Sequence, residues 1–91
     1  MRMIYELQPK YDSRKSFYGK AFVEEKENCK ILTSYQTDVA MIKDGKFYLK
    51  GMYSATTSRH IRDFAYQNGF NTDRKSLLGY IQDTQNDKVR F

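Results

Sequence analysis

The side chains in this sequence that are able to do chemistry are mostly cations and tyrosines. His60 is the only histidine and Cys29 the only cysteine, whereas the chain holds eight Tyr, six Phe and sixteen Lys and Arg. His60 lies between Arg59 and Arg62, just after a run of hydroxyl residues. A base that titrates near neutral pH, beside cations that hold a scissile phosphate, is what a small ribonuclease requires. One histidine is no catalytic constellation, so we favour a structural role with a local hydrogen bond.

Metal and cofactor chemistry finds little support in the residue types. A zinc site needs three or four Cys, His or carboxylate ligands, and Cys29 and His60 are the only soft candidates. The five glycines stand apart in the sequence, so no glycine-rich phosphate loop is present. We therefore expect no bound metal, no cofactor and no catalytic residue, and we predict that the protein is not an enzyme.

Cations interleaved with aromatic residues are the clearest functional pattern. Alternation along a strand places Lys46, Tyr48 and Lys50 on one face. In another predicted strand it places Tyr18, Lys20 and Phe22 on one face. Cations on such a face hold phosphates, and aromatic rings stack on bases. Half-exposed Tyr and Lys are also ordinary sheet surface, and this alternative stays open. The predicted binding patch comprises Lys46, Tyr48, Lys50, Tyr53, Arg59, His60, Arg62 and Tyr66, and the second strand face comprises Tyr18, Lys20 and Phe22.

Positive charge is concentrated in the middle of the chain. The formal net charge is +5, and residues 28–62 hold six cations against Asp38 and Asp44. Such a field attracts polyanions and acidic protein surfaces, although a merely solvated basic surface explains it equally well. The predicted last strand and the helix after it are consecutive, so we expect their cations to form one patch, made of Lys46, Lys50, Arg59 and Arg62.

Hydrophobic alternation predicts an antiparallel β-meander of four to five strands. Apolar residues alternate over 3–7, 15–24 and 29–35, and a compact apolar run at 39–42 is followed by a return strand over 46–52. Residues 8–14 are predicted as a loop. Asp44-Gly45 indicates a type I′ hairpin turn, which needs positive φ at both central residues. Short turns between strands favour antiparallel pairing.

The hydrophobic period changes to that of a helix after the last strand. Ser54 or Thr56 is expected to cap a main helix that runs to about Asn68, and Gly69 fits the left-handed stop position. Its buried face is predicted as Ile61, Phe64 and Ala65, and its solvent face as Arg59, Arg62, Asp63 and Tyr66.

A shorter second helix is expected to begin at Thr72-Asp73. Its predicted apolar side comprises Leu77, Leu78 and Ile81, and residues 82–91 are predicted as a loose tail. Strands followed by helices define an α+β fold, and a length of 91 residues allows a single domain over 1–91.

The composition also bears on the cellular setting. The longest purely apolar run is Val39–Ile42, so no segment is expected to span a bilayer, and no signal peptide is expected. A single cysteine fits a reducing compartment, and the expected location is the cytoplasm.

Three stretches resemble a family of small uncharacterised proteins of phages, prophages and other mobile elements. They are KSFYGKAFV at 15–23, LTSYQTDVAMIKDGK at 32–46 and, most specifically, YSATTSRHIRDFAYQNGF at 53–70. The resemblance implies a sheet followed by a helix and a phage setting, in which many small proteins bind host machinery or inhibit host defence, anti-CRISPR proteins among them. It implies no enzymatic activity.

The expected function is therefore a non-enzymatic phage or mobile-element protein that binds host machinery in the host cytoplasm, with anti-CRISPR-like inhibition of a defence system as one form. The expected partner is a host protein or protein–nucleic-acid complex, with no membrane, and the protein is a monomer or a homodimer. A small DNA- or RNA-binding regulator that contacts nucleic acid directly is the first alternative. A ribonuclease-like toxin centred on His60 is the second.

Overall fold

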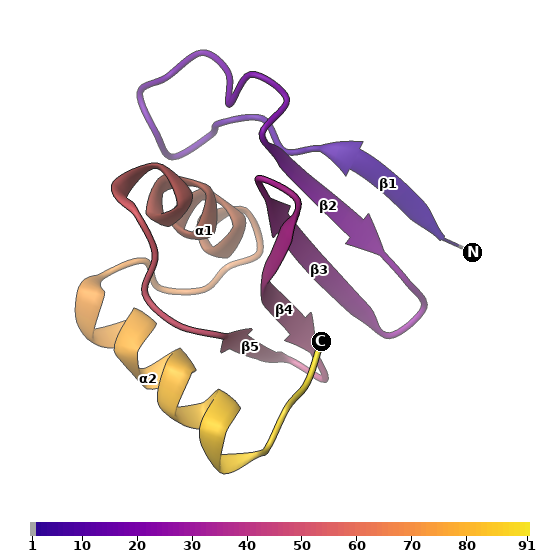
Figure 1. Ribbon diagram of the computed structural model, residues 1–91, viewed down its shortest axis with the longest axis vertical. Coiled ribbons are helices and arrows are strands. Elements are labelled where there is room, and N and C mark those ends of the chain that lie inside the picture. Colours follow the sequence, from indigo (N-terminus) through magenta and orange to yellow (C-terminus); the bar gives the residue numbers. More distant parts are fainter. Residues whose placement is uncertain (1) are drawn as a thin grey trace.

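Five antiparallel strands followed by two helices make up the computed structural model of the protein, which describes residues 2–91 (Figure 1). Met1 lies outside the described residues. The strands pair in chain order, each with the next. The predicted α+β class and the order of strands before helices are confirmed. The elements are β1 (Met3–Glu6), β2 (Ala21–Glu25), β3 (Cys29–Ser34), β4 (Thr37–Lys43), β5 (Lys46–Leu49), α1 (Ala55–Gln67) and α2 (Arg74–Asn86).

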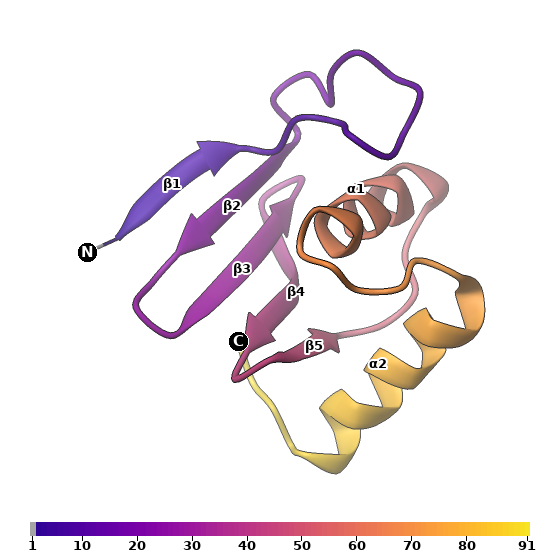
Figure 2. The ribbon, with the colours of Figure 1, turned by 180° about the vertical axis from the view of Figure 1, so that it is seen from behind.

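The main hydrophobic core lies between one face of the sheet and the two helices. In both ribbon views α1 lies against the sheet and α2 runs beside β5 (Figures 1 and 2). The apolar face of α1, Ile61, Phe64 and Ala65, is buried with Val39 of β4, as the sequence predicts. The alternation along β5 places Phe47 and Leu49 in this core and Tyr48 on the opposite face of the sheet.

Both ends of α1 are closed by the residues that the sequence predicts. Ser54 is the N-cap, and its side chain accepts a hydrogen bond from the Thr57 N–H. At the C-terminus Gly69 adopts φ +81°, its N–H donates to the Tyr66 carbonyl, and the Phe70 N–H donates to the Ala65 carbonyl. These two bonds form a Schellman motif.

The segment before β2 differs from the prediction. β2 begins at Ala21 rather than near Lys15, because Tyr18 and Gly19 adopt positive φ and the Lys20 N–H turns back to the Phe17 carbonyl at 3.0 Å. Residues 15–20 are therefore a turn and not a strand. Tyr18 and Lys20 project from this turn, so they do not share a strand face with Phe22. The last strand is also shorter than predicted and ends at Leu49.

The C-terminal region is more ordered than predicted. α2 has 13 residues, the same length as α1, and it includes residues 82–86. Leu78 is exposed, because the buried side of α2 is formed by Leu77 with partial burial of Tyr80 and Ile81. Beyond the helix, Val89 and Phe91 pack on a second small cluster on the far face of the sheet. No helix in the described part of the chain is long and apolar enough to cross a membrane.

Candidate nucleic-acid interface

Two turns present tyrosine rings at the same end of the sheet. Tyr18-Gly19 precedes β2, and Tyr35-Gln36 forms the two-residue loop between β3 and β4, where Ser34 pairs with Thr37. Tyr18 and Tyr35 both adopt positive φ, which costs a bulky L-residue about 1–2 kcal/mol. The two tyrosine residues are 73% and 50% exposed. Backbone strain of this kind concentrates at functional sites, so the two turns mark this end of the sheet as a candidate site.

A pocket of about 260 Å³ lies between these two turns and the start of α1. We call it the tyrosine pocket. Its cations come from three separate segments: Arg14 from the loop before β2, Lys20 from the first turn, and Arg59 from α1. The complete lining is Arg14, Ser16, Phe17, Tyr18, Lys20, Tyr35, Thr56, Arg59 and His60.

Two further hollows adjoin the tyrosine pocket, because they share residues with it. Lys20 and Tyr35 also line a hollow over the far face of the sheet, together with Phe22. Arg59 also lines a hollow beside the loop, together with Arg62. The three hollows form one continuous surface, which we call the basic surface. Its cations are Arg14, Lys20, Arg59 and Arg62, and its Tyr and Phe residues are Tyr11, Phe17, Tyr18, Phe22 and Tyr35.

His60 lies in the wall of the tyrosine pocket and is almost fully buried, at 1% exposure. Its Nδ1 atom is 2.8 Å from the Ser34 hydroxyl, which is in turn 3.1 Å from the Thr57 hydroxyl. The imidazole packs edge-on to Phe17 and stacks beneath Tyr35, with ring centroids 5.8 Å apart. Burial lowers the pKa of His60, while the negative charges of Asp12 and Asp63 oppose the shift. The histidine therefore supports the tyrosine that covers it.

Asp63 fastens the loop that carries Tyr11 and Arg14. Its carboxylate accepts hydrogen bonds from three consecutive backbone N–H groups, those of residues 10, 11 and 12, at 2.8–3.2 Å, and one from the Gln67 amide. The prediction that Asp63 faces solvent is wrong, since the loop crosses α1 and buries the carboxylate completely. Arg59 and Arg62 are half-buried and line one hollow together with residues of this loop.

The structure brings together most of the α1 residues and turn residues predicted as binding residues. Arg59, His60, Tyr18 and Lys20 meet at the tyrosine pocket, and Arg62 and Phe22 line the adjoining hollows. Tyr66 is exposed and packs on Tyr11, with ring centroids 5.3 Å apart. Tyr53 packs against the main core and lines none of the three hollows, and burial raises its pKa.

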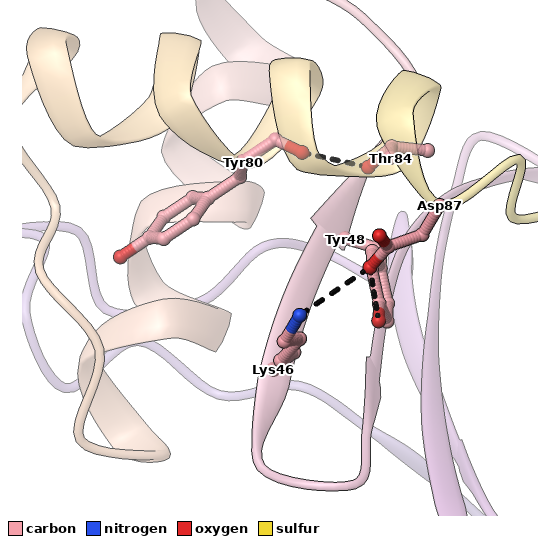
Figure 3. A network of polar contacts seen from close by, with 5 residues as sticks. All are labelled: Lys46, Tyr48, Tyr80, Thr84 and Asp87. Atoms are coloured by element: carbon pink, nitrogen blue, oxygen red, sulfur yellow. Dashed lines mark hydrogen bonds and ion pairs between the residues drawn. The ribbon is translucent and has the colours of Figure 1, made fainter.

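The remaining predicted residues lie on the opposite face of the sheet. Tyr48 is buried there, and its hydroxyl donates to Asp87 at the end of α2 at 3.0 Å (Figure 3). Lys46 contacts the same carboxylate at 3.5 Å, and the Lys50 ammonium lies 4.7 Å from the centre of the Phe91 ring. The expectation of one patch with Arg59 and Arg62 is therefore wrong. Because side chains alternate along β5, these three point away from α1, and they contact Asp87 and Phe91 of the C-terminal segment instead.

The cations and exposed aromatic residues of the basic surface that the sequence analysis missed are Tyr11, Arg14 and Tyr35. Tyr35 continues the apolar alternation of β3, so it reads as a strand residue, and nothing in a Tyr-Gln pair announces a turn with positive φ. Arg14 lies in a loop whose path depends on Asp63, 49 positions further along the chain. A signal was present for the first turn alone, because Tyr18 is followed by a glycine.

These features define a small α+β domain with a basic surface rich in aromatic residues. Within the described residues no group of three or more His, Cys, Asp or Glu side chains is placed to hold a metal ion. The chain belongs to a family of unknown function, DUF8033, whose family profile matches residues 5–79. No curated protein and no solved structure matches it. The matched span includes both tyrosine turns and all of α1, and it ends within α2.

Proposed function

We propose that this protein is a non-enzymatic binding protein that holds single-stranded nucleic acid on the basic surface. The observation that carries the proposal is the tyrosine pocket, where two exposed rings stand beside three cations. Exposed aromatic rings stack on unpaired bases, and Arg and Lys contact the phosphates between them.

Single strands suit this surface better than a duplex. The pocket is concave and has aromatic walls, so it takes a base whose face is free, whereas the base faces of a duplex are stacked on each other. Asp12 is the one carboxylate residue in the linings of the three hollows, against four cations. The charge of this surface therefore favours an anionic ligand over a neutral or basic one, and the exposed rings beside the cations favour nucleic acid among anionic ligands.

The ribonuclease alternative finds less support in the geometry. His60 is buried, one of its ring nitrogens is held by Ser34, and burial favours the neutral imidazole. It is also the only histidine, so a second imidazole for acid–base catalysis is lacking. Binding without cleavage is the function we propose.

A host-directed role would use the same surface. In the phage or mobile-element setting that the sequence resemblance implies, the bound strand would belong to a host protein–nucleic-acid complex in the cytoplasm, of which a CRISPR effector is one example. Occupying its nucleic acid would inhibit the complex without any catalytic residue. A regulator of phage or host nucleic acid would use the same contacts.

The proposal is tested by fluorescence anisotropy with labelled single-stranded and duplex oligonucleotides. We expect tighter binding of the single strand and a loss of roughly tenfold or more in Tyr18→Asn, which removes one stacking ring from a turn where Asn tolerates positive φ. Leu78→Asn, which changes an exposed residue of α2, is the matched control and should bind like the wild type. Absence of binding to both oligonucleotides would refute the proposal. In that case, capture of a nuclease-treated host complex would point to a protein partner instead.

A further inference from the structure

The two edge strands of the sheet, β1 and β5, differ in whether another element lies beside them. The β5 edge is covered by α2, and the Leu49 N–H donates to the Thr84 hydroxyl at 2.8 Å. The outer edge of β1 has no strand or helix beside it among the described residues (Figure 2). Proteins usually protect such an edge with charged side chains, Pro, a bulge or a short strand; β1 is short and carries Glu6, but it has no Lys, Pro or bulge. Met3 and Ile4 are instead 53% and 57% exposed.

The hydrogen-bond register shows which backbone groups this edge offers. The Leu7 N–H donates to the carbonyl of Ala21, the first residue of β2, at 2.9 Å. The N–H and C=O groups of Leu7 therefore point toward β2. Backbone groups alternate in direction along a strand, and in an antiparallel pair the N–H and C=O of one residue point the same way. Arg2, Ile4 and Glu6 therefore point their N–H and C=O groups outward from the sheet.

We propose that β1 pairs with β1 of a second copy of this chain, antiparallel and with the two-fold axis at Ile4. In this register Ile4 lies opposite Ile4 of the second copy, and Arg2 lies opposite Glu6 of the second copy at both ends of the pairing. The six outward-facing backbone donors and acceptors of each copy are then paired. Met3 lies opposite Tyr5 of the second copy, which covers the exposed apolar side chains.

The charges select this register over its neighbours. A pairing centred on Arg2 or on Glu6 places a like charge opposite itself, which is destabilising in an antiparallel pair. A pairing centred on Met3 or on Tyr5 also joins outward-facing backbone groups, but it places Arg2 or Glu6 opposite Ile4 of the second copy and so gains no charge pair. Only the pairing centred on Ile4 places opposite charges across the strands twice. Contacts within each copy already hold both charged side chains on the sheet face. Arg2 pairs with Glu24, and one carboxylate oxygen of Glu6 accepts a hydrogen bond from the Gly19 N–H at 2.8 Å. The other carboxylate oxygen of Glu6 is then available to Arg2 of the second copy.

The dimer contact is confined to a single short strand, so we expect a reversible dimer whose population rises with protein concentration. Sedimentation equilibrium of the wild type should show this monomer–dimer exchange. Arg2→Glu and Glu6→Arg should each weaken the dimer by roughly tenfold, since each places two like-charged pairs across the strands. An equimolar mixture of the two variants should restore dimers, because the mixed pair has opposite charges at both positions.

Thermal unfolding of each single variant checks that it is folded, and recovery of dimers in the mixture checks it independently. Ile4→Pro removes an outward-facing N–H and should abolish the dimer without any change of charge. A wild type that stays monomeric at the highest soluble concentration would overturn the proposal. Dimers that persist in Ile4→Pro, or variants that fail to associate when mixed, would overturn the β1 pairing and its register.

Discussion

Residues that look alike in the sequence have different surroundings in the folded chain. Arg59, His60 and Asp63 lie within five positions of each other on α1, yet Arg59 is half-exposed and the other two are buried. His60 packs on Phe17 and Tyr35, and the loop before β2 covers Asp63. A helical wheel places residues relative to the helix axis alone, so it cannot include a loop that crosses the helix. Ser34, the polar partner of His60, is 26 positions away, and the backbone N–H groups that donate to Asp63 are more than 50 positions away. Their burial is therefore a tertiary effect.

Because of His60, the free energy of unfolding should decrease as the pH falls below about 6.5. The unfolded chain has a histidine pKa near 6.5, and burial lowers it in the folded protein. The unfolded state therefore binds more protons in this range, so the His60 contribution is complete above about pH 6.5 and is lost as the pH falls through the folded pKa. Melting temperatures across this range measure the effect. His60→Gln should remove the slope, because no other histidine is present, and an unchanged slope would contradict the account.

Asp63→Asn should loosen the loop that carries Arg14. The amide keeps one acceptor oxygen, but it places an NH₂ group against backbone donors that the carboxylate now accepts. We expect a loss of about 2–3 kcal/mol in the free energy of unfolding, measured by urea denaturation. Hydrogen exchange should become faster at residues 10–12. Gln67→Ala removes the amide hydrogen bonds to Asp63 and to the Gln8 carbonyl but keeps the bonds from the three backbone N–H groups to Asp63, and it should cost clearly less.

The elements themselves are largely readable from local sequence, and the turns less so. The α1 caps, the Asp44-Gly45 hairpin and the alternation of β3 to β5 follow from short-range patterns, and all are found in the structure. The predicted strands are wrong at Tyr18-Gly19 and at Tyr35-Gln36, where the structure has turns. Large residues there adopt left-handed backbone conformations, which the sequence pattern does not indicate. Local propensity disfavours a tyrosine at positive φ in both turns, so tertiary contacts must hold these conformations. These two turns form the candidate site.

Relieving the second turn should separate stability from binding. Tyr35→Asn combined with Gln36→Gly gives the Asn-Gly pair that a type I′ hairpin prefers, so the backbone strain is removed. We expect a gain of about 1 kcal/mol in unfolding free energy, offset in part by the lost contact with His60. Oligonucleotide affinity should fall at the same time. A variant that is both more stable and fully active in binding would show that Tyr35 serves no ligand.

The packing of α1 on the sheet is tested by Phe64→Ala. Phe64 is 1% exposed and contacts Phe47 of β5, with ring centroids 5.7 Å apart. Removal of the ring leaves a cavity, and we expect a loss of about 3–5 kcal/mol, enough to unfold much of a domain of this size. Differential scanning calorimetry measures it. A nearly unchanged melting temperature would show that α1 does not pack as described.

At the level of the whole molecule, the sheet separates two faces with different tasks. Consecutive elements suggested that the cations of β5 and α1 would meet, but strand alternation places them on opposite faces. Lys46 and Lys50 contact Asp87 and Phe91 of the C-terminal segment, whereas Arg14, Lys20 and Arg59 line the tyrosine pocket. The fold class was predictable because it depends on pattern and order. The site was only partly predictable, because it depends on which loop crosses which element.

The central claim concerns the charge of the basic surface, and a matched pair of charge reversals tests it most directly. Arg14→Glu with Lys20→Glu changes two exposed cations of the tyrosine pocket. Lys26→Glu with Lys43→Glu makes the same net change in two exposed cations at the opposite ends of β2 and β4. Arg59 and Arg62 are less suitable, since both are half-buried and Arg62 also donates to the Thr72 carbonyl.

The measurement is single-strand affinity as a function of salt concentration. If four cations contact phosphates, the logarithm of the wild-type affinity should fall with a slope of about −3 against the logarithm of salt concentration. The Arg14 and Lys20 reversal should weaken binding more than roughly tenfold and flatten the slope to about −1, while the Lys26 and Lys43 reversal should stay close to the wild type. Equal losses in both variants, or an affinity independent of salt, would contradict a phosphate-binding surface at the tyrosine pocket.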